Sequence, residues 1–410
     1  MGEGAVGLAR PKQYREFCVR CGAKPPEGFQ TFCSCGGMID VAYDLEVARL
    51  VDSPNSLERY FDLLPLTTTD HLLPFEIEAT PCVHAVRLGE ELGLERLYLK
   101  DESVLPTGTT KDRMAAVALP YLIEKGVRKF CMSSTGNSST SFAHMIGLAP
   151  ECLLYIFTAE SFLPRVQCPV SDQIIHIALR DASFVDAFEG AKGYAERHGI
   201  VPERGFFNPA RREGLKLAYL EAAEQIPGPI DWYVQAVSSA MGVYGTFKGA
   251  KELRSLGATS SLPRLLCVQQ ETCSPMVRAF EEGSPVIRPE HIVEKPSGIA
   301  SAILRGNPTG AYPYVREIVI ESGGRLVAVS ETQIREARSM VEEIEGLSPC
   351  FSASAAVAGM VRMRREGVLS EKQTILVNLT GSDRQKASHA EPHHWMECTD
   401  RGWEIVSDVT

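Results

Sequence analysis

A lysine at the start of a predicted helix is the residue of this sequence best suited to act as a nucleophile. Lys111 follows a loop that contains Pro106 and Gly108, and the helical pattern begins at the lysine itself. Burial and the positive end of a helix dipole both lower the pKa of a lysine and favour the neutral amine. Such an amine can form an imine with a carbonyl group. By itself, however, a lysine at a helix start is usually a surface residue.

A second polar loop follows at residues 133–139, between a predicted strand and a predicted helix. Hydroxyl groups and backbone N–H groups at a helix start can bind a carboxylate, and the amide of Asn137 can donate to a further oxygen. A loop of this composition that only caps its helix is the alternative. The predicted carboxylate-binding residues are Ser134, Thr135, Gly136, Ser138 and Ser139.

Two further polar segments each follow an apolar run of the sequence. A loop follows the apolar run 233–237 and leads into a helix, which is where converging N–H groups bind phosphate. It has one glycine, so the serine hydroxyls would supply some of the bonds. The loop residues are Ser238, Ser239, Ala240, Met241 and Gly242. Thr380 follows the apolar segment that ends at Leu379 and places a neutral hydroxyl at a strand end.

Four cysteines in two close pairs near the start of the chain are typical of a zinc ribbon. Thiolates on tight turns that contain glycine can close a tetrahedral metal site, although the second pair has one intervening residue instead of two. A knuckle that holds no metal is the alternative. The candidate ligands are Cys18, Cys21, Cys33 and Cys35.

The elements that must position these residues alternate between strands and helices. This alternation predicts a parallel sheet with helices on both faces, and hence an α/β fold. Predicted strands lie at 97–99, 129–132, 152–157, 232–237 and 264–269, and predicted helices at 85–94, 111–124, 139–148, 211–225 and 244–256. Residues 385–410, which contain His389, His393, His394 and Cys398, are predicted to be a solvated tail rather than a second metal site.

Length and charge narrow the function. With 410 residues, two main domains plus an appendage are expected. A net charge of -10 without a basic run argues against a nucleic-acid partner. We find neither a signal peptide nor a stretch of about 20 apolar residues, so the sequence predicts a cytoplasmic protein without membrane partners, whose 12 cysteines are mostly reduced.

The segment around Lys111 resembles a known cofactor motif. Threonine synthases and related fold-type-II pyridoxal-phosphate enzymes, of the tryptophan synthase beta-like superfamily, have Pro-Thr-Gly-Ser-Phe-Lys-Asp-Arg there. Residues 106–113 match six of these eight positions, with Thr109 and Thr110 as the departures. The resemblance implies that Lys111 holds pyridoxal 5'-phosphate as an imine.

The other segments match the same family in the same order. The loop at 133–139 resembles Ser-Thr-Gly-Asn-Thr-Ser, and residues 378–381 resemble the end of the last core strand. The resemblance implies that Asn137, the 238–242 loop and Thr380 contact the phenolate oxygen, phosphate and pyridine nitrogen of the cofactor. A neutral hydroxyl at that nitrogen suits elimination and replacement better than transamination.

The resemblance also implies the domain organisation. We expect two parallel-sheet α/β domains with the cofactor in the cleft between them, plus the knuckle. The boundaries are 1–45 for the zinc-ribbon-like segment, 75–110 with 215–385 for the large cofactor-binding domain, 111–214 for a small mobile domain, and 386–410 for the tail.

The implied reaction is elimination or replacement on an amino acid with a β or γ leaving group, in which freed Lys111 acts as general base at the α-carbon. Threonine synthases grip a substrate phosphate with Ser-Val-Asn-Pro-x-Arg. This chain retains the arginine as Arg211 but has Phe206 at the serine position, which favours a non-standard substrate. Alternatives are a replacement like that of cysteate synthase on phosphoserine, a deaminating lyase, and a non-catalytic binding homologue. Expected partners are the amino acid, a second nucleophile and, as in relatives, a second copy in a homodimer.

Overall fold

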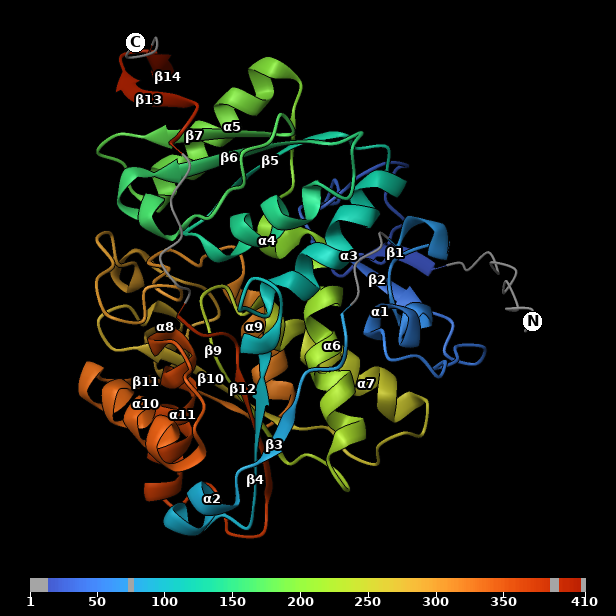
Figure 1. The fold of residues 1–410 in the computed structure, drawn as a ribbon, viewed down its shortest axis with the longest axis vertical. Helices are drawn as coiled ribbons and strands as arrows, with labels where there is room; N and C mark the ends of the chain where they lie inside the picture. Colours follow the sequence, from blue (N-terminus) through green and yellow to red (C-terminus); the bar gives the residue numbers. More distant parts are fainter. Residues whose placement is uncertain (1–13, 73–76, 384–390, 407–410) are drawn as a thin grey trace.

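The computed structural model describes residues 14–72, 77–383 and 391–406. In this part of the chain the strands form two six-stranded sheets and a separate two-stranded sheet. Figure 1 shows the two large sheets one above the other, with helices α3 (Lys111–Glu124) and α4 (Asn137–Ile146) lying between them. The predicted α/β class is confirmed.

The first large sheet has the strand order β11-β10-β9-β12-β4-β3. Its strands are nearly continuous buried apolar runs, as parallel strands covered on both faces require. Neighbouring strands are parallel except for β3 and β4 at one edge. The strands are β3 (Cys82–His84), β4 (Arg96–Asp101), β9 (Trp232–Ala236), β10 (Arg264–Gln270), β11 (Arg325–Val329) and β12 (Thr374–Leu379).

Alternate residues of these strands enter two different hydrophobic clusters because successive side chains point to opposite faces. Tyr233 packs toward α6 and α7, whereas Trp232 and Val234 pack toward α10 and α11. The helices of this half are α2 (Val86–Leu92), α6 (Pro209–Gln225), α7 (Met241–Ser255), α8 (Pro275–Glu281), α9 (Tyr312–Glu321), α10 (Glu331–Glu345) and α11 (Phe351–Arg365).

The second large sheet has the order β14-β13-β7-β6-β5-β8 and is parallel except between β13 and β14. Helix α5 (Phe184–His198) covers one face and α4 lies near the other (Figure 1). The strands are β5 (Lys129–Ser133), β6 (Leu153–Ala159), β7 (Ile174–Leu179), β8 (Val201–Pro202), β13 (His394–Thr399) and β14 (Gly402–Val406).

The predicted solvated tail is wrong for residues 394–406, which form the hairpin β13–β14. Strand β13 pairs in parallel with β7, and Met396 is fully buried against that sheet. The imidazole of His393 accepts a hydrogen bond from the backbone N–H of His176, so it supports the sheet. His389 lies outside the described residues. Residues 394–406 look polar in the sequence, but the burial of a few of their apolar side chains against a distant strand stabilises the hairpin.

A small two-stranded sheet forms the N-terminal knuckle. Strands β1 (Tyr14–Cys18) and β2 (Ile39–Tyr43) are antiparallel. Arg212 of α6 donates to the carbonyl oxygen of Ile39 at 2.7 Å and contacts Asp40 at 3.2 Å. The knuckle is therefore fixed to the helix that starts beside the cleft. Arg212 is thus a structural residue whose acidic partner, Asp40, lies on β2.

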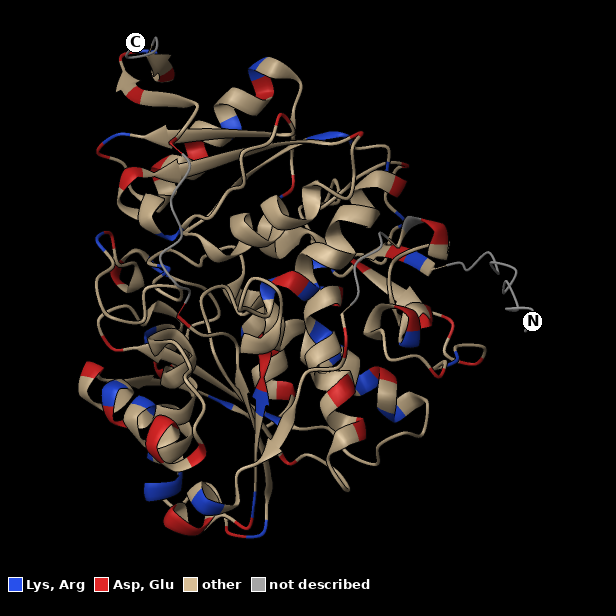
Figure 2. Ribbon diagram, in the orientation of Figure 1, with Lys and Arg blue, Asp and Glu red and all other residues tan. Residues whose placement is uncertain are grey.

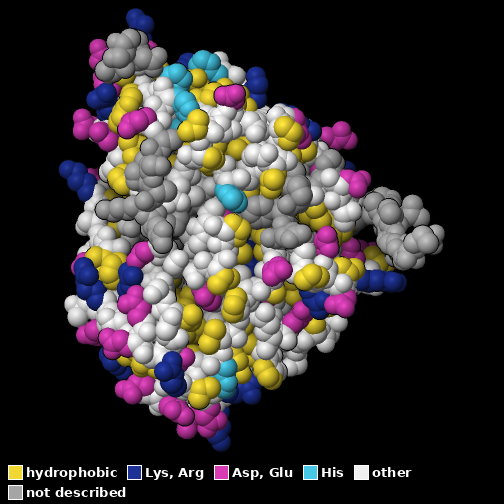
Figure 3. Space-filling view, in the orientation of Figure 1, with side chains coloured by type: hydrophobic (Ala, Val, Ile, Leu, Met, Phe, Trp, Pro, Cys, Tyr) yellow, Lys and Arg dark blue, Asp and Glu magenta, His cyan; other side chains and the backbone are white. Residues whose placement is uncertain are grey.

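Charged residues occur in the interior as well as at the surface. Figure 2 shows acidic and basic positions on β4, α3 and α6, and one side chain from each is buried: Lys100, Arg113 and Glu221. On the face drawn in Figure 3, acidic and basic side chains are interspersed around the rim. None of the described helices is long and apolar enough to cross a membrane.

Candidate active site

A pocket of about 400 Å³ lies where the carboxyl ends of strands from both large sheets meet. Its lining includes the end of β5 from one sheet and the end of β9 from the other. The crevice at the carboxyl ends of parallel strands is the usual ligand site of open α/β folds. The pocket lining contains most of the residues predicted from the sequence: Lys111, Ser134, Thr135, Asn137, Ser138, Arg211, Ser238, Ser239, Ala240, Met241, Gly242 and Thr380.

The turn before Lys111 is held by the residues on either side of the lysine. The carboxylate of Asp112 accepts from the backbone N–H and the hydroxyl of Thr107, both at 2.7 Å. The backbone N–H of Thr110 donates to the carbonyl oxygen of Thr380 at 3.0 Å. These bonds fix the start of α3 against the end of β12, so Lys111 and Thr380 enter the pocket together.

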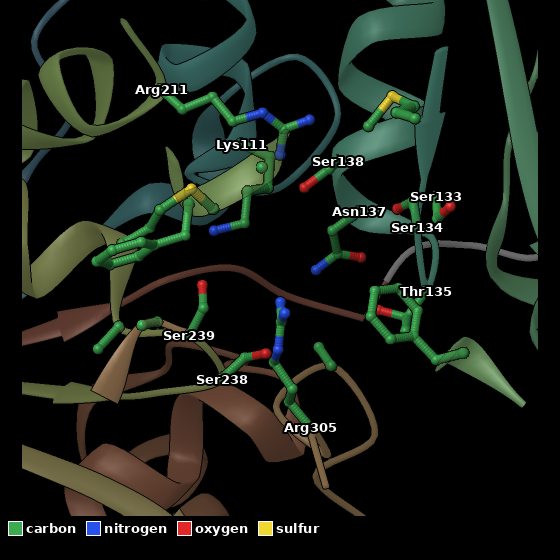
Figure 4. A pocket seen from close by; sticks show the side chains of 18 of the residues that line it. Lys111, Ser133, Ser134, Thr135, Asn137, Ser138, Arg211, Ser238, Ser239 and Arg305 are labelled. Atoms are coloured by element: carbon green, nitrogen blue, oxygen red, sulfur yellow. The ribbon is translucent and has the colours of Figure 1, made fainter. Parts of the chain in front are cut away.

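The amine of Lys111 lies in an environment that favours its neutral form. Burial, reinforced by the nearby guanidinium of Arg211, lowers the pKa of Lys111 to about 8. In Figure 4 the amine points to the centre of the pocket, toward Ser239 and Asn137. The combination of a buried amine and a lowered pKa is what imine formation needs.

The loop between β5 and α4 places its asparagine and serines on one side of the pocket (Figure 4). The hydroxyl oxygen of Ser134 accepts from the backbone N–H groups of Gly136 and Ser139, at 3.1 and 3.2 Å. Gly136 and Ser139 themselves are absent from the pocket lining. Ser134 therefore shapes the loop, and its neighbours in the pocket lining are Thr135, Asn137 and Ser138.

The loop between β9 and α7 has the geometry of a phosphate cradle. It leads straight into the N-terminus of a helix of 15 residues, where backbone N–H groups are unpaired. Ala240 has a positive φ of 60°, a costly conformation that occurs mainly at functional sites. A Cβ atom on Gly242 would lie 2.8 Å from the side-chain nitrogen of Gln235, so a larger residue would have to displace that side chain. The single glycine of the loop thus lets Gln235 pack closely against it.

Arg211 lies at the pocket but is already paired. Its guanidinium bonds to Glu203, and both side chains are 4% exposed. Burial raises the pKa of Glu203 and lowers the pKa of Arg211. The opposite charge of each side chain counteracts the pKa shift of the other. Glu203 was not predicted, because the two residues meet only through the turn that precedes α6.

A second arginine, Arg305, points toward Asn137 and Ser238 (Figure 4). Its Nε donates to the carbonyl oxygen of Asn307 at 3.3 Å, and its guanidinium lies 5.7 Å from the ring centre of Phe184. Burial lowers its pKa, and among the described residues it forms no ion pair with a carboxylate. Arg305 was not predicted as a site residue, because a lone arginine in a loop gives no signal in the sequence.

The charge of the pocket lining is opposite to that of the chain. The lining contains one acidic residue, Glu203, which is paired with Arg211. The chain as a whole has a net charge of -10. An acidic protein that gathers cations in one cavity is built for anionic ligands. The basic residues of the lining are Lys111, Lys192, Arg204, Arg211 and Arg305.

Aromatic rings form one wall of the pocket. Phe207 lies 4.4 Å from Phe32 and 5.4 Å from Phe206, measured between ring centres. Phe206 packs in turn against Tyr244. Phe32 comes from the knuckle and was not predicted as a site residue, because nothing in its sequence neighbourhood indicates that the knuckle reaches the pocket.

The four predicted cysteine ligands lie outside the pocket and are brought together. Their sulfur atoms all lie within 4.8 Å of one another. Among the described residues this is the one group of histidine, cysteine and acidic side chains so placed. Four convergent thiols are the donor set that zinc prefers.

The residues of the pocket fit pyridoxal phosphate. They provide a buried amine of lowered pKa, an N-terminal helix end for a phosphate, and a neutral hydroxyl, Thr380, at the end of β12. The family model described as pyridoxal-phosphate dependent enzyme matches residues 73–381. The chain belongs to this family, and it is an enzyme of the elimination and replacement type.

Two kinds of curated relative span nearly the whole chain. A threonine synthase from Methanosarcina acetivorans is 30% identical over 90% of this chain and 91% of its own length. A cysteate synthase from Methanospirillum hungatei is 28% identical over 90% of this chain and 89% of its own. The predicted threonine-synthase-like family is thereby confirmed.

Solved structures confirm the fold. Maize serine racemase superposes with a TM-score of 0.64 over 77% of this chain and 92% of that chain, at 20% identity. The processed form of a threonine deaminase from Solanum lycopersicum gives 0.60 over 75% of this chain and 84% of that chain, at 17% identity. The predicted fold-type-II architecture is correct.

Proposed function

We propose that Lys111 holds pyridoxal phosphate and is the general base of an elimination or replacement on an amino acid with an anionic β or γ substituent. The observation that carries this proposal is the buried amine of Lys111, whose pKa burial lowers to about 8, beside a helix N-terminus suited to phosphate. Bound cofactor supplies an electron sink at the substrate's α-carbon. A lysine released from its own bond can then move the α-proton.

The other residues bind and orient. Asn137 would hold the ring oxygen of the cofactor, Thr380 would face the ring nitrogen, and the backbone of residues 238–242 would hold the phosphate. Thr135 and Ser138, with the N–H groups at the start of α4, would hold the substrate carboxylate. The aromatic wall would exclude water from the reacting carbon. The placement of these residues around one cavity supports these roles (Figure 4).

The substituent that leaves the substrate is proposed to meet Arg305 rather than Arg211. The charge of Arg211 is paired with Glu203, and Phe206 lies in the same wall without a hydroxyl donor. Arg305 is a pocket cation without a carboxylate partner among the described residues, and it points toward Asn137 and Ser238. A charged hydrogen bond to an anion is worth about 1.5–3 kcal/mol. A phosphorylated or otherwise anionic amino acid fits this arrangement.

Replacement of the cysteate synthase kind is the second candidate. The 28% identity to a cysteate synthase over 90% of this chain supports it. Release of phosphate from O-phosphoserine that depends on sulfite would favour this candidate. Ammonia release without a second substrate would favour a deaminating lyase instead. The second nucleophile and a homodimer remain part of the proposal.

A panel of amino acids that includes O-phosphoserine and O-phosphohomoserine tests the proposal by the absorbance of the bound cofactor. The native protein should respond to an anionic member, and Lys111→Ala should lose the cofactor-lysine absorbance and turnover. Lys129→Ala, at an exposed position on β5, is the matched control and should behave as native. A Lys111→Ala protein with normal absorbance and turnover would refute the assignment. Purified native protein without a cofactor band would favour a binding homologue.

A further inference from the structure

We propose that the knuckle is part of the active site: zinc bound by Cys18, Cys21, Cys33 and Cys35 holds Phe32 in place as a wall of the substrate pocket. The inference rests on the proposed function only in taking this pocket as the substrate site. It assigns a positioning role to the metal and a specificity role to Phe32.

The separations of the four sulfur atoms suit one tetrahedral ion. Cys18 and Cys35 are 3.5 Å apart, Cys21 and Cys35 3.5 Å, and Cys21 and Cys33 3.7 Å. Zinc–sulfur bonds of about 2.3 Å place the sulfurs of a tetrahedron about 3.8 Å apart. A Cβ on Gly37 would lie 2.5 Å from the sulfur of Cys18. Glycine at this position keeps the two halves of the cluster together.

Phe32 is rigidly linked to this cluster. It directly precedes Cys33, and it forms an isolated antiparallel bridge with Met38. The backbone N–H of Cys33 donates to the carbonyl oxygen of Gly37 at 2.8 Å. A metal ion bonded to Cys33 and Cys35 would therefore fix the backbone from which the Phe32 ring projects.

The ring of Phe32 faces the pocket. It is 38% exposed, which is a high value for a phenylalanine, and it lines the cavity. It packs on the ring of Phe207, at 4.4 Å, in the turn Gly205–Phe207 that leads into α6. An aromatic pair at this distance stabilises the turn by roughly 0.5–1.5 kcal/mol beyond area burial, which corresponds to a factor of about two to twelve.

The rest of the knuckle is anchored without the metal. Arg212 holds Ile39 and Asp40, and the hydroxyl of Tyr314 accepts from the backbone N–H of Met38 at 3.1 Å. Loss of zinc should therefore release the loop 20–37 and the Phe32 ring while leaving β1 and β2 docked. This separation makes the proposal testable apart from general unfolding.

The test uses the full chain and needs no substrate. Zinc is measured by elemental analysis, and hydrogen exchange is followed by mass spectrometry before and after chelation. We expect one zinc per chain and, after chelation, exchange at residues 205–208 that is about threefold to tenfold faster. Exchange in 39–43 should not change. Zinc absent from the purified protein, or faster exchange confined to 20–37, would overturn the proposal.

Variants distinguish the contribution of the Phe32 ring from that of the metal. Phe32→Ala should keep its zinc yet reproduce the faster exchange at 205–208. Phe29 lies in the same loop but packs on Tyr121 outside the pocket lining, so Phe29→Ala should leave exchange at 205–208 unchanged. Cys398→Ser, an exposed thiol on β13, is the control for Cys33→Ser, which should lose zinc. A Phe32→Ala protein with native exchange at 205–208 would contradict the role of the ring.

Substrate binding provides the link to function. Phe32→Ala should weaken the binding of whichever panel amino acid changes the cofactor absorbance, while cofactor content stays native. If no amino acid changes the absorbance of the native protein, the proposed function fails, and the exchange data still decide the role of the knuckle.

Discussion

Two lysines eleven positions apart show how neighbours decide the role of a charge. Lys100 is fully buried, whereas Lys111 is half-buried at the edge of the pocket. The amine of Lys100 donates to a carboxylate oxygen of Glu221 at 2.8 Å and to the carbonyl oxygen of Thr80 at 2.6 Å. The amine of Lys111 points into a cavity, and the guanidinium of Arg211 is near enough to lower its pKa. A lysine with a carboxylate partner serves as a structural ion, whereas a lysine that faces a cavity is available to act as a nucleophile.

The contrast extends to the regions around the two lysines. Behind the pocket, the guanidinium of Arg113 bonds to both Glu102 and Glu221, and all three side chains are at most 1% exposed. In the pocket, Arg305 lacks such partners among the described residues. The paired region fixes the helix that carries Lys111, and the unpaired region is the one proposed to bind anions. The following predictions test this division, from the largest expected effect to the smallest.

Removal of the buried ion pairs behind the pocket should cause the largest loss in the free energy of unfolding. Arg113→Leu leaves Glu102 and Glu221 buried without their shared cation, and removal of one partner of a buried ion pair costs about 3–5 kcal/mol. The free energy of unfolding from urea denaturation measures this loss. Arg335→Leu removes an exposed pair with Glu331 on α10 and should cost less than about 0.5 kcal/mol. Equal losses in the two variants would contradict the division.

The rate at which Lys111 reacts with the cofactor should depend on pH. Because the pKa of Lys111 is lowered to about 8, its neutral nucleophilic fraction falls about tenfold for each pH unit below 8. Recombination of apoprotein with pyridoxal phosphate, followed by absorbance, should therefore slow about fiftyfold from pH 8 to pH 6 and level off above pH 9. A rate that keeps rising to pH 10 would indicate a lysine of ordinary pKa.

The free pocket cation should determine which substrates bind. Arg305→Leu should weaken the binding of O-phosphoserine about tenfold to a hundredfold, the value of a charged hydrogen bond, and leave serine binding unchanged. Arg305→Lys keeps the charge and should recover part of the affinity. Spectroscopic titration of the bound cofactor gives both dissociation constants. Equal weakening for O-phosphoserine and serine would show that Arg305 only supports the loop.

The sequence predicted the elements and residues whose signals are local. The loop with Pro106 and Gly108 placed Lys111 correctly at the start of α3, and the apolar runs at 232–237 and 264–269 became β9 and β10. Here each segment's own pattern agrees with its place in the fold.

What escaped prediction depends on distant contacts. Strand β13 pairs with β7 more than two hundred residues away, and Phe32 reaches the pocket through long-range contacts such as that of Arg212, which docks the knuckle on α6. Charges of α6 such as Glu213 and Lys216 resemble a solvated face in the sequence but are fully buried against each other. A single sequence lists charged residues without showing their partners, and the partners decide whether a charge is structural or functional.

The smallest effect should come from freeing the second pocket arginine. Glu203→Gln keeps the shape of the side chain but removes the negative charge that pairs with Arg211. An anion can then compete for the guanidinium of Arg211. Inhibition by inorganic phosphate should strengthen about threefold to tenfold, less than the effect at Arg305 because the glutamine oxygen still accepts one hydrogen bond. Glu151→Gln, at the exposed turn before β6, is the control and should leave inhibition unchanged. If phosphate inhibition does not change in Glu203→Gln, Arg211 is held away from the ligand by packing on Phe142 rather than by its ion pair, and Arg305 alone defines the anion site.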